Sequence, residues 1–486
     1  MTTRAFGETG VDAGRIDAIV ERVLQRLAKD ADADTAAASS FAPGAGGPVF
    51  ETVDEAASAA RQAFLDLQET SLETRDRMIA GIREAVERHA ARLAEWAVRE
   101  TGLGRADDKI AKNLLVGRKT PGTEILVPRA KSGDHGLSLE EWAPYGVILS
   151  VTPSTNPSET VINNGIGMLA GGNATIFAPH PGAREVSLET VALLEKAARE
   201  AGGPPNVFTT VATPSIEATQ ALMRHERVRL LVVTGGGGVV QEAMSVGKRA
   251  ITAGPGNPPV VVDTTADLDR AASGIYLGAS FDNNIVCTDE KEVIAVDRIR
   301  DDLVKRIVAL GAYELRGREL DAVRKLVLAE NRGPRRRSVV SREWIGKDAG
   351  VILEAAGVDG PRDTRLLIAA VGEDDPFLWT ELMMPVLGIA GVRDVDVAID
   401  LAREVEGGCF HTASMYSRNI EKLSRMARVC DCSIYVKNGP HYNGLGYGGE
   451  GYTSFTIASP TGEGMTTARS FTRVRRCALI DSFRIV

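Results

Sequence analysis

The sequence predicts an α/β protein whose parallel sheets are covered by helices on both faces. Residues 145–262 alternate short apolar strands with helical segments, and a second stretch from about 256 to 455 does the same. Such alternation is typical of parallel sheets, because parallel neighbours need a crossover connection between them. The chain has 486 residues, which is too long for one simple core, so we expect two or three domains.

The first patterned segment is residues 15–27. It carries one apolar stripe of a 3.6-residue period with charged side chains opposite, formed by Ile16, Ile19, Val20, Val23, Leu24 and Leu27. Residues 28–48 are rich in Ala, Asp, Ser, Gly and Pro, the composition of a flexible tether. A short helix on such a tether is marginal alone, so we expect residues 1–30 to dock on a partner, with residues 31–48 as the linker. The alternative is that this helix packs back on its own chain.

The rest of the chain is divided by the same patterns. Helices are predicted at 53–67, 72–89 and 90–101. Strands are predicted at 147–151, 174–178, 206–211, 229–233, 259–263, 292–296, 366–371 and 433–437. Residues 134–142 alternate like the strand of an outlying ribbon, and the tail returns to strand character at 478–480 and 483–486. An apolar terminal strand is a liability unless it is paired, so the tail indicates an oligomer.

Composition argues against several classes of function. The formal charge of -8 disfavours nucleic acid as a partner. No apolar run approaches the roughly 18 residues of a membrane helix, and the N-terminus lacks the apolar core of a secretory signal. The five cysteines form no disulfide pattern, which fits a reducing cytoplasm. Cys430 and Cys432 are separated by one residue, unlike the pairs of zinc sites, and we expect no metal.

A thiol and an amide stand out as candidate catalytic groups. Cys287 follows Asn156 by about 130 residues, and Asn156 lies on a proline-framed turn just after the apolar segment 147–151. A thiol that attacks a carbonyl needs a donor that stabilises the oxyanion, and an Asn amide can supply it. The alternative for Cys287 is a small buried hydrophobic residue.

Several motifs in one order resemble the aldehyde dehydrogenases, in particular the CoA-acylating propionaldehyde and acetaldehyde dehydrogenases of bacterial microcompartments. They are Thr152–Pro157, Gly172–Pro181, Thr234–Gly236, Ala253–Pro259, Asn283–Cys287, Glu381–Val386 and His411–Ser414. The resemblance runs from about residue 50 to the C-terminus. It implies two doubly wound α/β domains, one for the cofactor and one for catalysis, with a small β-ribbon oligomerisation domain.

The resemblance also implies the domain limits. Residues 49–255 would bind NAD(P), with a ribbon segment near 132–144; residues 256–460 would carry the catalytic thiol, and residues 461–486 would form an oligomerisation tail. A homodimer or homotetramer is expected, located in the cytoplasm inside the lumen of a microcompartment. Residues 15–27 would then bind a shell protein.

Site residues follow by the same resemblance. Cys287 would be the nucleophile, Asn156 the oxyanion donor and His411 a candidate assistant. The cofactor would be NAD, with NADP left open, and its contacts would be Thr152, Pro153, Pro179, Thr234, Gly235, Gly236, Gly254 and Glu381. The run Thr234–Gly238 also suits a pyrophosphate on physical grounds, since it lies between a strand and a helix and carries few side chains. Ala178 occupies the place of a lysine that binds the adenosine ribose in hydrolytic members, which leaves the mode of adenosine binding open.

The departure at Ala253 favours coenzyme A as cosubstrate. Hydrolytic members carry a glutamate base there, whereas this chain reads Ala253–Pro259 without a carboxylate. Without a base to activate water, hydrolysis of a thioacyl enzyme should be slow, and the thiol of CoA can attack instead. We therefore expect oxidation of a short aliphatic aldehyde to acyl-CoA through a cysteine thioacyl intermediate. The alternatives are a hydrolytic aldehyde dehydrogenase and a non-catalytic microcompartment scaffold component.

Overall fold

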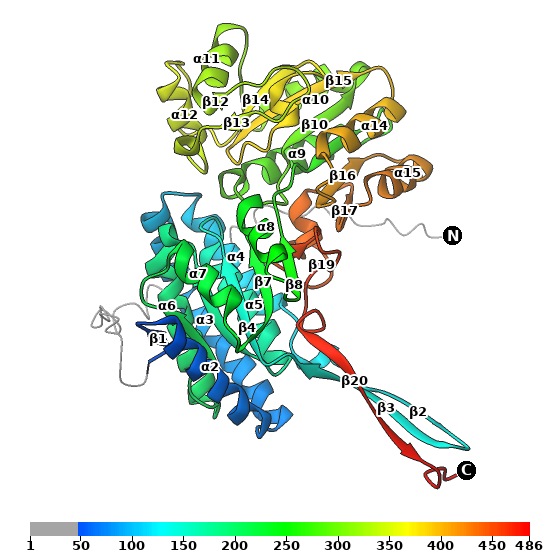
Figure 1. The fold of residues 1–486 in the computed structure, drawn as a ribbon. Helices are drawn as coiled ribbons and strands as arrows, with labels where there is room; N and C mark the ends of the chain where they lie inside the picture. The colour runs from blue at the N-terminus through cyan, green and yellow to red at the C-terminus, as the bar shows by residue number, and fades with distance from the viewer. Residues whose placement is uncertain (1–46) are drawn as a thin grey trace, which may run out of the picture. The chain divides into compact units, whose positions relative to one another are not determined.

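The computed structural model describes residues 47–486. The predicted helix at 15–27 and residues 31–46 of the predicted linker lie outside the described residues, so both stay predictions. The described chain forms two large parallel sheets and three small antiparallel ones (Figure 1). No helix in residues 47–486 is both long enough and apolar enough to cross a membrane.

The first parallel sheet has the strand order β1-β6-β5-β4-β7-β8. Its strands are β1 (Val49–Phe50), β4 (Val147–Thr152), β5 (Ala174–Pro179), β6 (Phe208–Val211), β7 (Val228–Thr234) and β8 (Ala250–Ala253). The chain steps in one direction from β4 through β5 to β6 and in the other direction from β7 to β8, so the winding reverses between β4 and β7. In doubly wound sheets, ligands bind beyond the carboxyl ends of the strands at such a switch point.

Seven helices of the described chain surround this sheet. They are α2 (Val53–Gln68), α3 (Leu72–Thr101), α4 (Ala106–Lys119), α5 (Pro157–Ala170), α6 (Arg184–Glu200), α7 (Ile216–Arg224) and α8 (Gly237–Ser245). Right-handed crossovers place α5 and α6 on one face and α7 and α8 on the other. Helices α3 and α4 pack against α5, and α3 also packs against α6. The two separate helices expected at 72–89 and 90–101 are one continuous helix, since no proline interrupts α3.

The second parallel sheet has the strand order β11-β14-β15-β10-β9-β16-β17. Its strands are β9 (Pro259–Val262), β10 (Glu292–Val296), β11 (Tyr313–Glu314), β14 (Leu367–Val371), β15 (Val386–Val392), β16 (Thr412–Tyr416) and β17 (Ile434–Lys437). Its helices are α9 (Leu268–Ser280), α10 (Asp297–Ala309), α11 (Arg318–Val327), α12 (Ala349–Ala355), α13 (Pro376–Trp379), α14 (Val395–Glu406) and α15 (Ile420–Cys430). Strand β9 was expected in the first alternating stretch, but it pairs with β10 and β16 here.

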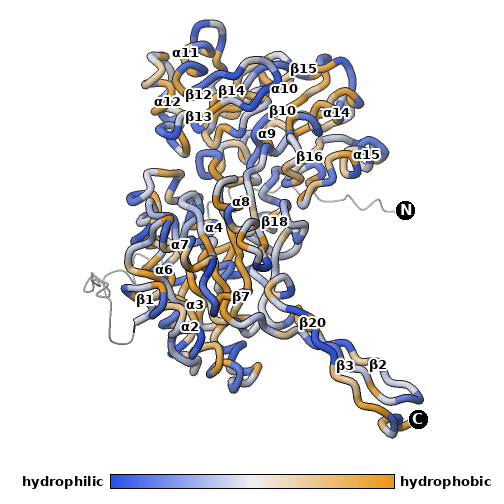
Figure 2. The backbone as a smooth tube through the Cα atoms, in the orientation of Figure 1, coloured by the Kyte–Doolittle hydropathy of each residue, from blue (hydrophilic) through white to orange (hydrophobic). Residues whose placement is uncertain are grey.

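Both faces of the second sheet are buried at its centre, which explains why the central strands are mostly apolar. Val260 and Val262 of β9 pack into one core with residues of α9 and α10, whereas Val261 between them packs into the opposite core with residues of α12 and α14. Successive side chains of a strand point to opposite faces, so a strand covered on both sides needs apolar residues at every position. The strands around β7 in the first sheet show the same apolar character in Figure 2.

The remaining strands form small antiparallel sheets. The largest has the order β2-β3-β20, from β2 (Arg129–Gly133), β3 (Gly136–Pro144) and β20 (Thr472–Ile480). Two strand pairs join β12 (Leu328–Glu330) to β13 (Val339–Val340) and β18 (Ile457–Ala458) to β19 (Gly464–Met465). Short 3₁₀ turns are η2 (Thr123–Ile125), η3 (Pro181–Ala183), η4 (Phe281–Asn284), η5 (Arg342–Trp344) and η6 (His441–Leu445).

The ribbon differs in detail from the expectation. The strand predicted at 134–142 is found at β3, and the tail pairs with it along β20. Residues 129–133 form a further strand, β2, that the pattern did not separate from the loop before it. The last predicted strand, at 483–486, is absent, because β20 ends at Ile480 and Asp481 and Ser482 turn in the left-handed region.

Candidate active site

The predicted site residues lie at one edge of each parallel sheet. In the first sheet they follow the carboxyl ends of strands: Thr152 and Pro153 at β4, Pro179 at β5, Thr234, Gly235 and Gly236 at β7, and Gly254 at β8. In the second sheet they precede the amino ends of strands: Cys287 before β10, Glu381 before β15 and His411 before β16. Since the strands of each sheet are parallel, residues from distant parts of the sequence meet at a shared edge.

The edge of the first sheet fits a dinucleotide. Gly236 caps the N-terminus of α8, and a Cβ added at Gly236, Gly237 or Gly238 would meet open space. These residues therefore leave the first backbone N–H groups of α8 clear, which is the arrangement that binds phosphate. The hydroxyl of Thr152 is buried at the switch point without a hydrogen-bond partner among the described residues. Pro179 is connected to this edge, because the N–H of the next residue, His180, donates to the Thr152 carbonyl at 3.1 Å.

The segment that leads from the first sheet to the second passes by the backbone of Cys287. Ala253 is 4% exposed, and its carbonyl accepts from the N–H of Gly235 at 3.2 Å. A Cβ added at Gly256 would lie 3.1 Å from the carbonyl oxygen of Cys287 and 2.9 Å from Cγ of His411. The backbone of Gly256 therefore lies against both the Cys287 carbonyl and the His411 ring, and only glycine leaves room for this approach.

Cys287 follows a tight turn of unusual backbone geometry. Asp282, Asn283 and Asn284 have φ angles of 44°, 53° and 62°, so three successive residues lie in the left-handed region. Asp and Asn tolerate this region better than other side chains with a Cβ, yet a run of three is strained. The surrounding structure must therefore hold this turn in place.

Buried polar groups supply that restraint. The amide of Asn283 donates to the carbonyl of Gly346 and to Asp348, both at 2.9 Å. The amide of Asn284 donates to the carbonyls of Ala279 and Glu290 at 3.0 and 2.8 Å. Hydrogen bonds from both asparagine side chains thus stabilise the turn.

Lys291 fixes the segment between this turn and the thiol. Its ammonium donates to the carbonyl of Asn284 at 2.7 Å, to the Asn284 side chain at 2.8 Å and to the carbonyl of Val286 at 3.1 Å. The side chain is 2% exposed, so this buried cation uses its three donors on the nucleophile loop.

The surroundings of the half-buried Cys287 favour the protonated thiol. Burial, and next the carboxylate of Glu381, raise its pKa to about 12, whereas the Lys291 ammonium acts in the opposite direction. Activation of the nucleophile therefore requires a change in its surroundings, or a base that takes the proton.

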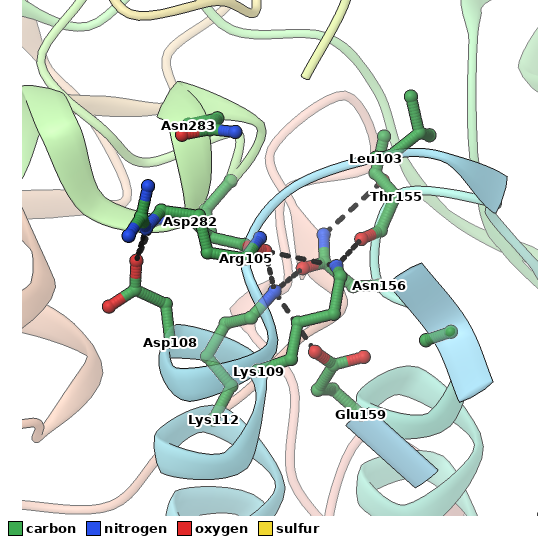
Figure 3. A network of polar contacts seen from close by, with 12 residues as sticks. Leu103, Arg105, Asp108, Lys109, Lys112, Thr155, Asn156, Glu159, Asp282 and Asn283 are labelled. Atoms are coloured by element: carbon green, nitrogen blue, oxygen red, sulfur yellow. Dashed lines mark hydrogen bonds and ion pairs between the residues drawn. The ribbon is translucent and has the colours of Figure 1, made fainter. Parts of the chain in front are cut away.

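Asn156 begins helix α5 and is 6% exposed (Figure 3). Its side chain does not cap the helix. Instead its Oδ1 accepts from the ammonium of Lys112 at 2.5 Å, and its Nδ2 donates to the hydroxyl of Thr155 at 3.3 Å. An amide that accepts a charged hydrogen bond at its oxygen keeps its N–H groups available for another acceptor.

His411 is a buried, neutral imidazole. Its Nδ1 shares a hydrogen bond with the hydroxyl of Thr412 at 2.9 Å, and its Nε2 is buried without a partner among the described residues. Burial, and secondarily Lys291, lower the pKa of His411 to about 4. The ring is neutral, lies against Gly256 and has one nitrogen without a partner, so it can accept a proton as a weak base.

Glu381 lines a small pocket of about 150 Å³. The pocket is formed by Pro255, Gly256, Asn257, Arg337, Ser338, Val340, Thr380 and Glu381. Burial raises the pKa of Glu381, and Lys291, the N–H of Gly256 and Arg337 act against that rise. The carboxylate thus lies in a pocket that shares Gly256 with the thiol and the imidazole. Residues 47–486 contain no cluster of side chains that could hold a metal ion.

Four charged residues of the site were not identified from sequence: Lys109, Lys112, Asp282 and Lys291. Lysines in a helix usually face solvent, so the two on α4 carried no signal. The run Asp282–Asn284 could have been read as a left-handed turn, because these residue types favour that backbone region.

Comparison with known proteins agrees with this geometry. The profile of the aldehyde dehydrogenase family matches residues 49–470. The chain is 50% identical to acetaldehyde dehydrogenase (acetylating) EutE of Escherichia coli, over 97% of this chain and 99% of the relative.

Two solved structures are similar throughout. One is Rhodopseudomonas palustris propionaldehyde dehydrogenase with bound CoA and an acylated cysteine, at 45% identity and a TM-score of 0.87, covering 90% of this chain and 99% of that one. The other is a propionaldehyde dehydrogenase from the Clostridium phytofermentans fucose utilisation bacterial microcompartment, at 42% identity and a TM-score of 0.88, covering 90% and 100%. With a family profile that matches most of its length, the chain belongs to the aldehyde dehydrogenase family.

Proposed function

We propose that this chain is a CoA-acylating aldehyde dehydrogenase that converts a short aliphatic aldehyde, CoA and NAD⁺ to acyl-CoA and NADH. One observation supports CoA, rather than water, as the acceptor of the acyl group. The segment Ala253–Pro259 lies against Cys287 through Gly256 and contains no carboxylate that could activate water. The thioacyl enzyme therefore persists until a thiol attacks it. The similarity to EutE and to a structure with bound CoA supports the same choice.

In the proposed first half-reaction, the Cys287 thiol loses its proton to solvent as its sulfur adds to the aldehyde carbon, which forms a thiohemiacetal oxyanion. The amide N–H of Asn156 stabilises the oxyanion, because Lys112 holds the opposite end of that amide. The glycine-rich edge of the first sheet would hold NAD⁺, which would supply the hydride acceptor, and Cys287 would then carry the thioacyl group. Glu381 orients the nicotinamide ribose from its pocket next to Gly256.

In the proposed second half-reaction, the sulfur of CoA adds to the thioacyl carbon and Cys287 leaves as thiolate. The products are acyl-CoA and free enzyme, because the departing Cys287 thiolate takes up the proton that the CoA thiol has lost. His411 assists by accepting that proton, since its buried Nε2 is unused and its ring is neutral above a pH of about 4.

Thr152, Pro153, Pro179, Thr234, Gly235, Gly236 and Gly254 are proposed as the surroundings of the cofactor. Acetaldehyde and propionaldehyde are the proposed substrates, because the similar proteins are named for these aldehydes. One methylene changes binding only modestly, so activity with both is expected.

The deciding experiment follows NADH absorbance with aldehyde and NAD⁺, with and without CoA. Sustained turnover should require CoA, and without CoA the burst of NADH should not exceed the enzyme concentration. Cys287→Ala should abolish both signals while the protein stays folded. Steady acid formation without CoA would support the hydrolytic alternative, and absence of any NADH would support the scaffold alternative.

Two further parts of the proposal concern partners. We assign residues 15–27 to docking on a shell protein and the enzyme to the lumen of a cytoplasmic microcompartment, as the similarity to a microcompartment enzyme suggests. We also assign the β2-β3-β20 sheet to self-association as a homodimer or homotetramer. Strand β20 is an edge strand with exposed apolar side chains, among them Val474, Leu479 and Ile480.

A further inference from the structure

A buried lysine on α4 contacts both segments proposed to be catalytic, the one that carries Asn156 and the one that leads to Cys287. Lys112 is 1% exposed. Its ammonium donates to Oδ1 of Asn156 and to Oδ2 of Asp282, each at 2.5 Å, and forms an ion pair with Glu159 at 2.9 Å (Figure 3). Asn156 follows β4 of the first sheet, whereas Asp282 belongs to the left-handed turn five residues before Cys287. One cation thus joins the amide segment to the nucleophile segment.

The chemistry of the ammonium fixes the orientation of the Asn156 amide. An ammonium group only donates, so it must face the oxygen of the amide. The two ends of an Asn amide have nearly the same shape, and an unrestrained amide can present either end. With Oδ1 held by Lys112, Nδ2 is left to face other acceptors, and Thr155 is its one protein partner among the described residues. Only this orientation offers an N–H to an oxyanion.

The cation also strengthens the amide as a donor. Hydrogen bonds in series polarise one another in a low-dielectric interior, so a positive charge at Oδ1 makes Nδ2–H more acidic. The charges behind the amide are balanced, because Lys109 and Lys112 face Asp282 and Glu159, and all four side chains are at most 1% exposed. Loss of Lys112 would leave one excess negative charge where an oxyanion must form.

Lys109 provides an internal comparison. Its ammonium donates to Asp282 at 3.0 Å and to the carbonyl of Thr155 at 2.9 Å, and no contact between it and the Asn156 amide is found. It is as buried as Lys112 and shares the Asp282 partner. The two lysines therefore differ in whether they contact the amide of Asn156.

We propose that Lys112 is a positioning residue that turns the N–H of Asn156 toward the reacting carbonyl and holds that amide in register with the Cys287 loop. This inference rests on the proposed role of Asn156 in the acylating reaction. It predicts that removing Lys112 and removing Asn156 cause largely the same loss of kcat, so the two losses do not multiply in the double variant.

The test is a double-mutant cycle with Lys112→Met, Asn156→Ala and the double variant, measured as kcat for CoA-dependent oxidation of acetaldehyde. Lys112→Met should lower kcat about tenfold to a hundredfold with KM for aldehyde changed less than about threefold, since one oxyanion donor is worth about 10²–10³ in kcat. In the Asn156→Ala background, the same change should cost less than about threefold. Lys109→Met is the matched control, and its effect should multiply with that of Asn156→Ala.

The outcomes separate the two proposals. If Asn156→Ala keeps near-wild-type kcat, the proposed role of Asn156 fails, and the role of Lys112 fails with it. If Asn156→Ala is impaired but the two losses multiply fully, only the role of Lys112 is overturned. The role of Lys112 is also overturned if Lys109→Met and Asn156→Ala are coupled as strongly as Lys112→Met and Asn156→Ala. Thermal unfolding confirms the folded state of each variant, and Lys112→Gln, which keeps a neutral donor, replaces Lys112→Met in the cycle if the latter does not fold.

Discussion

Gly104 approaches Asp282 so closely that a Cβ at position 104 would lie 2.1 Å from Oδ1 of the carboxylate. The N–H of the next residue, Arg105, donates to the same oxygen at 2.7 Å. The loop before α4 therefore fits tightly around the carboxylate that binds Lys109 and Lys112. The left-handed turn before Cys287 depends on this fit.

Gly104→Ala should disturb the nucleophile turn as well as the backbone at position 104. The added methyl must displace Asp282, so we expect a loss of about 1–3 kcal/mol in the free energy of unfolding and a clear fall in kcat. Gly102→Ala is the control: its φ of 66° is equally unfavourable, but its Cβ would meet only the flexible end of Lys347 at 3.0 Å. Denaturant unfolding and steady-state kinetics compare the two. Equal kcat values would contradict the role assigned to Asp282.

Glu381→Gln should lower the pKa of Cys287. The Glu381 carboxylate favours the protonated thiol, so removing its charge favours the thiolate. The rate of alkylation of Cys287 by iodoacetamide, followed against pH, should therefore show a midpoint below that of the wild type. The exposed Glu51→Gln should leave the midpoint unchanged, and an upward shift for Glu381→Gln would reverse the electrostatic assignment.

Glu290→Gln should change how stability depends on pH. Burial raises the pKa of Glu290 to about 8 in the folded protein, above its unfolded value near 4.5. The contribution of Glu290 is therefore fully present below about pH 4.5 and is lost as pH rises toward 8. Relative to the wild type, the variant should gain about 1.4 kcal/mol per pH unit between roughly pH 5 and 7.5. Denaturant unfolding across this range checks it against the exposed Glu69→Gln, and parallel curves for Glu290→Gln and the wild type would refute it.

Removing residues 1–30 should leave specific activity unchanged but abolish co-sedimentation with microcompartment shells. The predicted stripe would dock by apolar burial, at roughly 25 cal/mol per Å². Replacing both Ile19 and Val23 with Glu should have the same effect without shortening the chain. A truncated enzyme that still packages normally, or that unfolds, would assign the helix to the catalytic body.

Ending the chain after Thr472 should dissociate the oligomer. This truncation removes nearly all of β20 and the apolar tail after it. Size-exclusion chromatography with light scattering should then report the mass of a monomer. An unchanged assembly would show that subunits associate through another surface.

Sequence predicted most strands because they are buried on both faces. The segments 147–151 and 292–296 are apolar except for Ser150 and Glu292, and they appear as β4 and β10. The segment 259–263 lies where the two expected alternating stretches overlap, and its pairing with β10 and β16 could not be predicted, since pairing between strands depends on contacts far along the chain that a local pattern does not record. The ribbon tail was extended too far for a similar reason, because the turn at Asp481 and Ser482 has no local breaker such as proline.

Only some residues of the candidate site could be predicted from the sequence. Cys287, Asn156 and His411 stand in motifs whose residue types suggest their chemistry. The buried lysines could not be found, because their charge is compatible with a buried position only when Asp282 and Glu159 are brought to them by folding. The hydrogen bonds that hold the turn before Cys287 could not be predicted either, although its Asp and Asn residues favour a left-handed turn.

The pairing of Lys112 with Asp282 spans 170 positions of sequence, and this has a consequence for biosynthesis. A nascent chain that has not yet delivered Asp282 presents two ammonium groups of α4 to Glu159 alone. A buried unpaired charge costs about 3–5 kcal/mol, which is a large part of the stability of a typical domain. Packing of the first sheet and its helices around two charged lysines of α4 is therefore expected to be unfavourable until Asp282 is available. The first sheet is therefore expected to reach its final packing only after the turn before Cys287 has been synthesised.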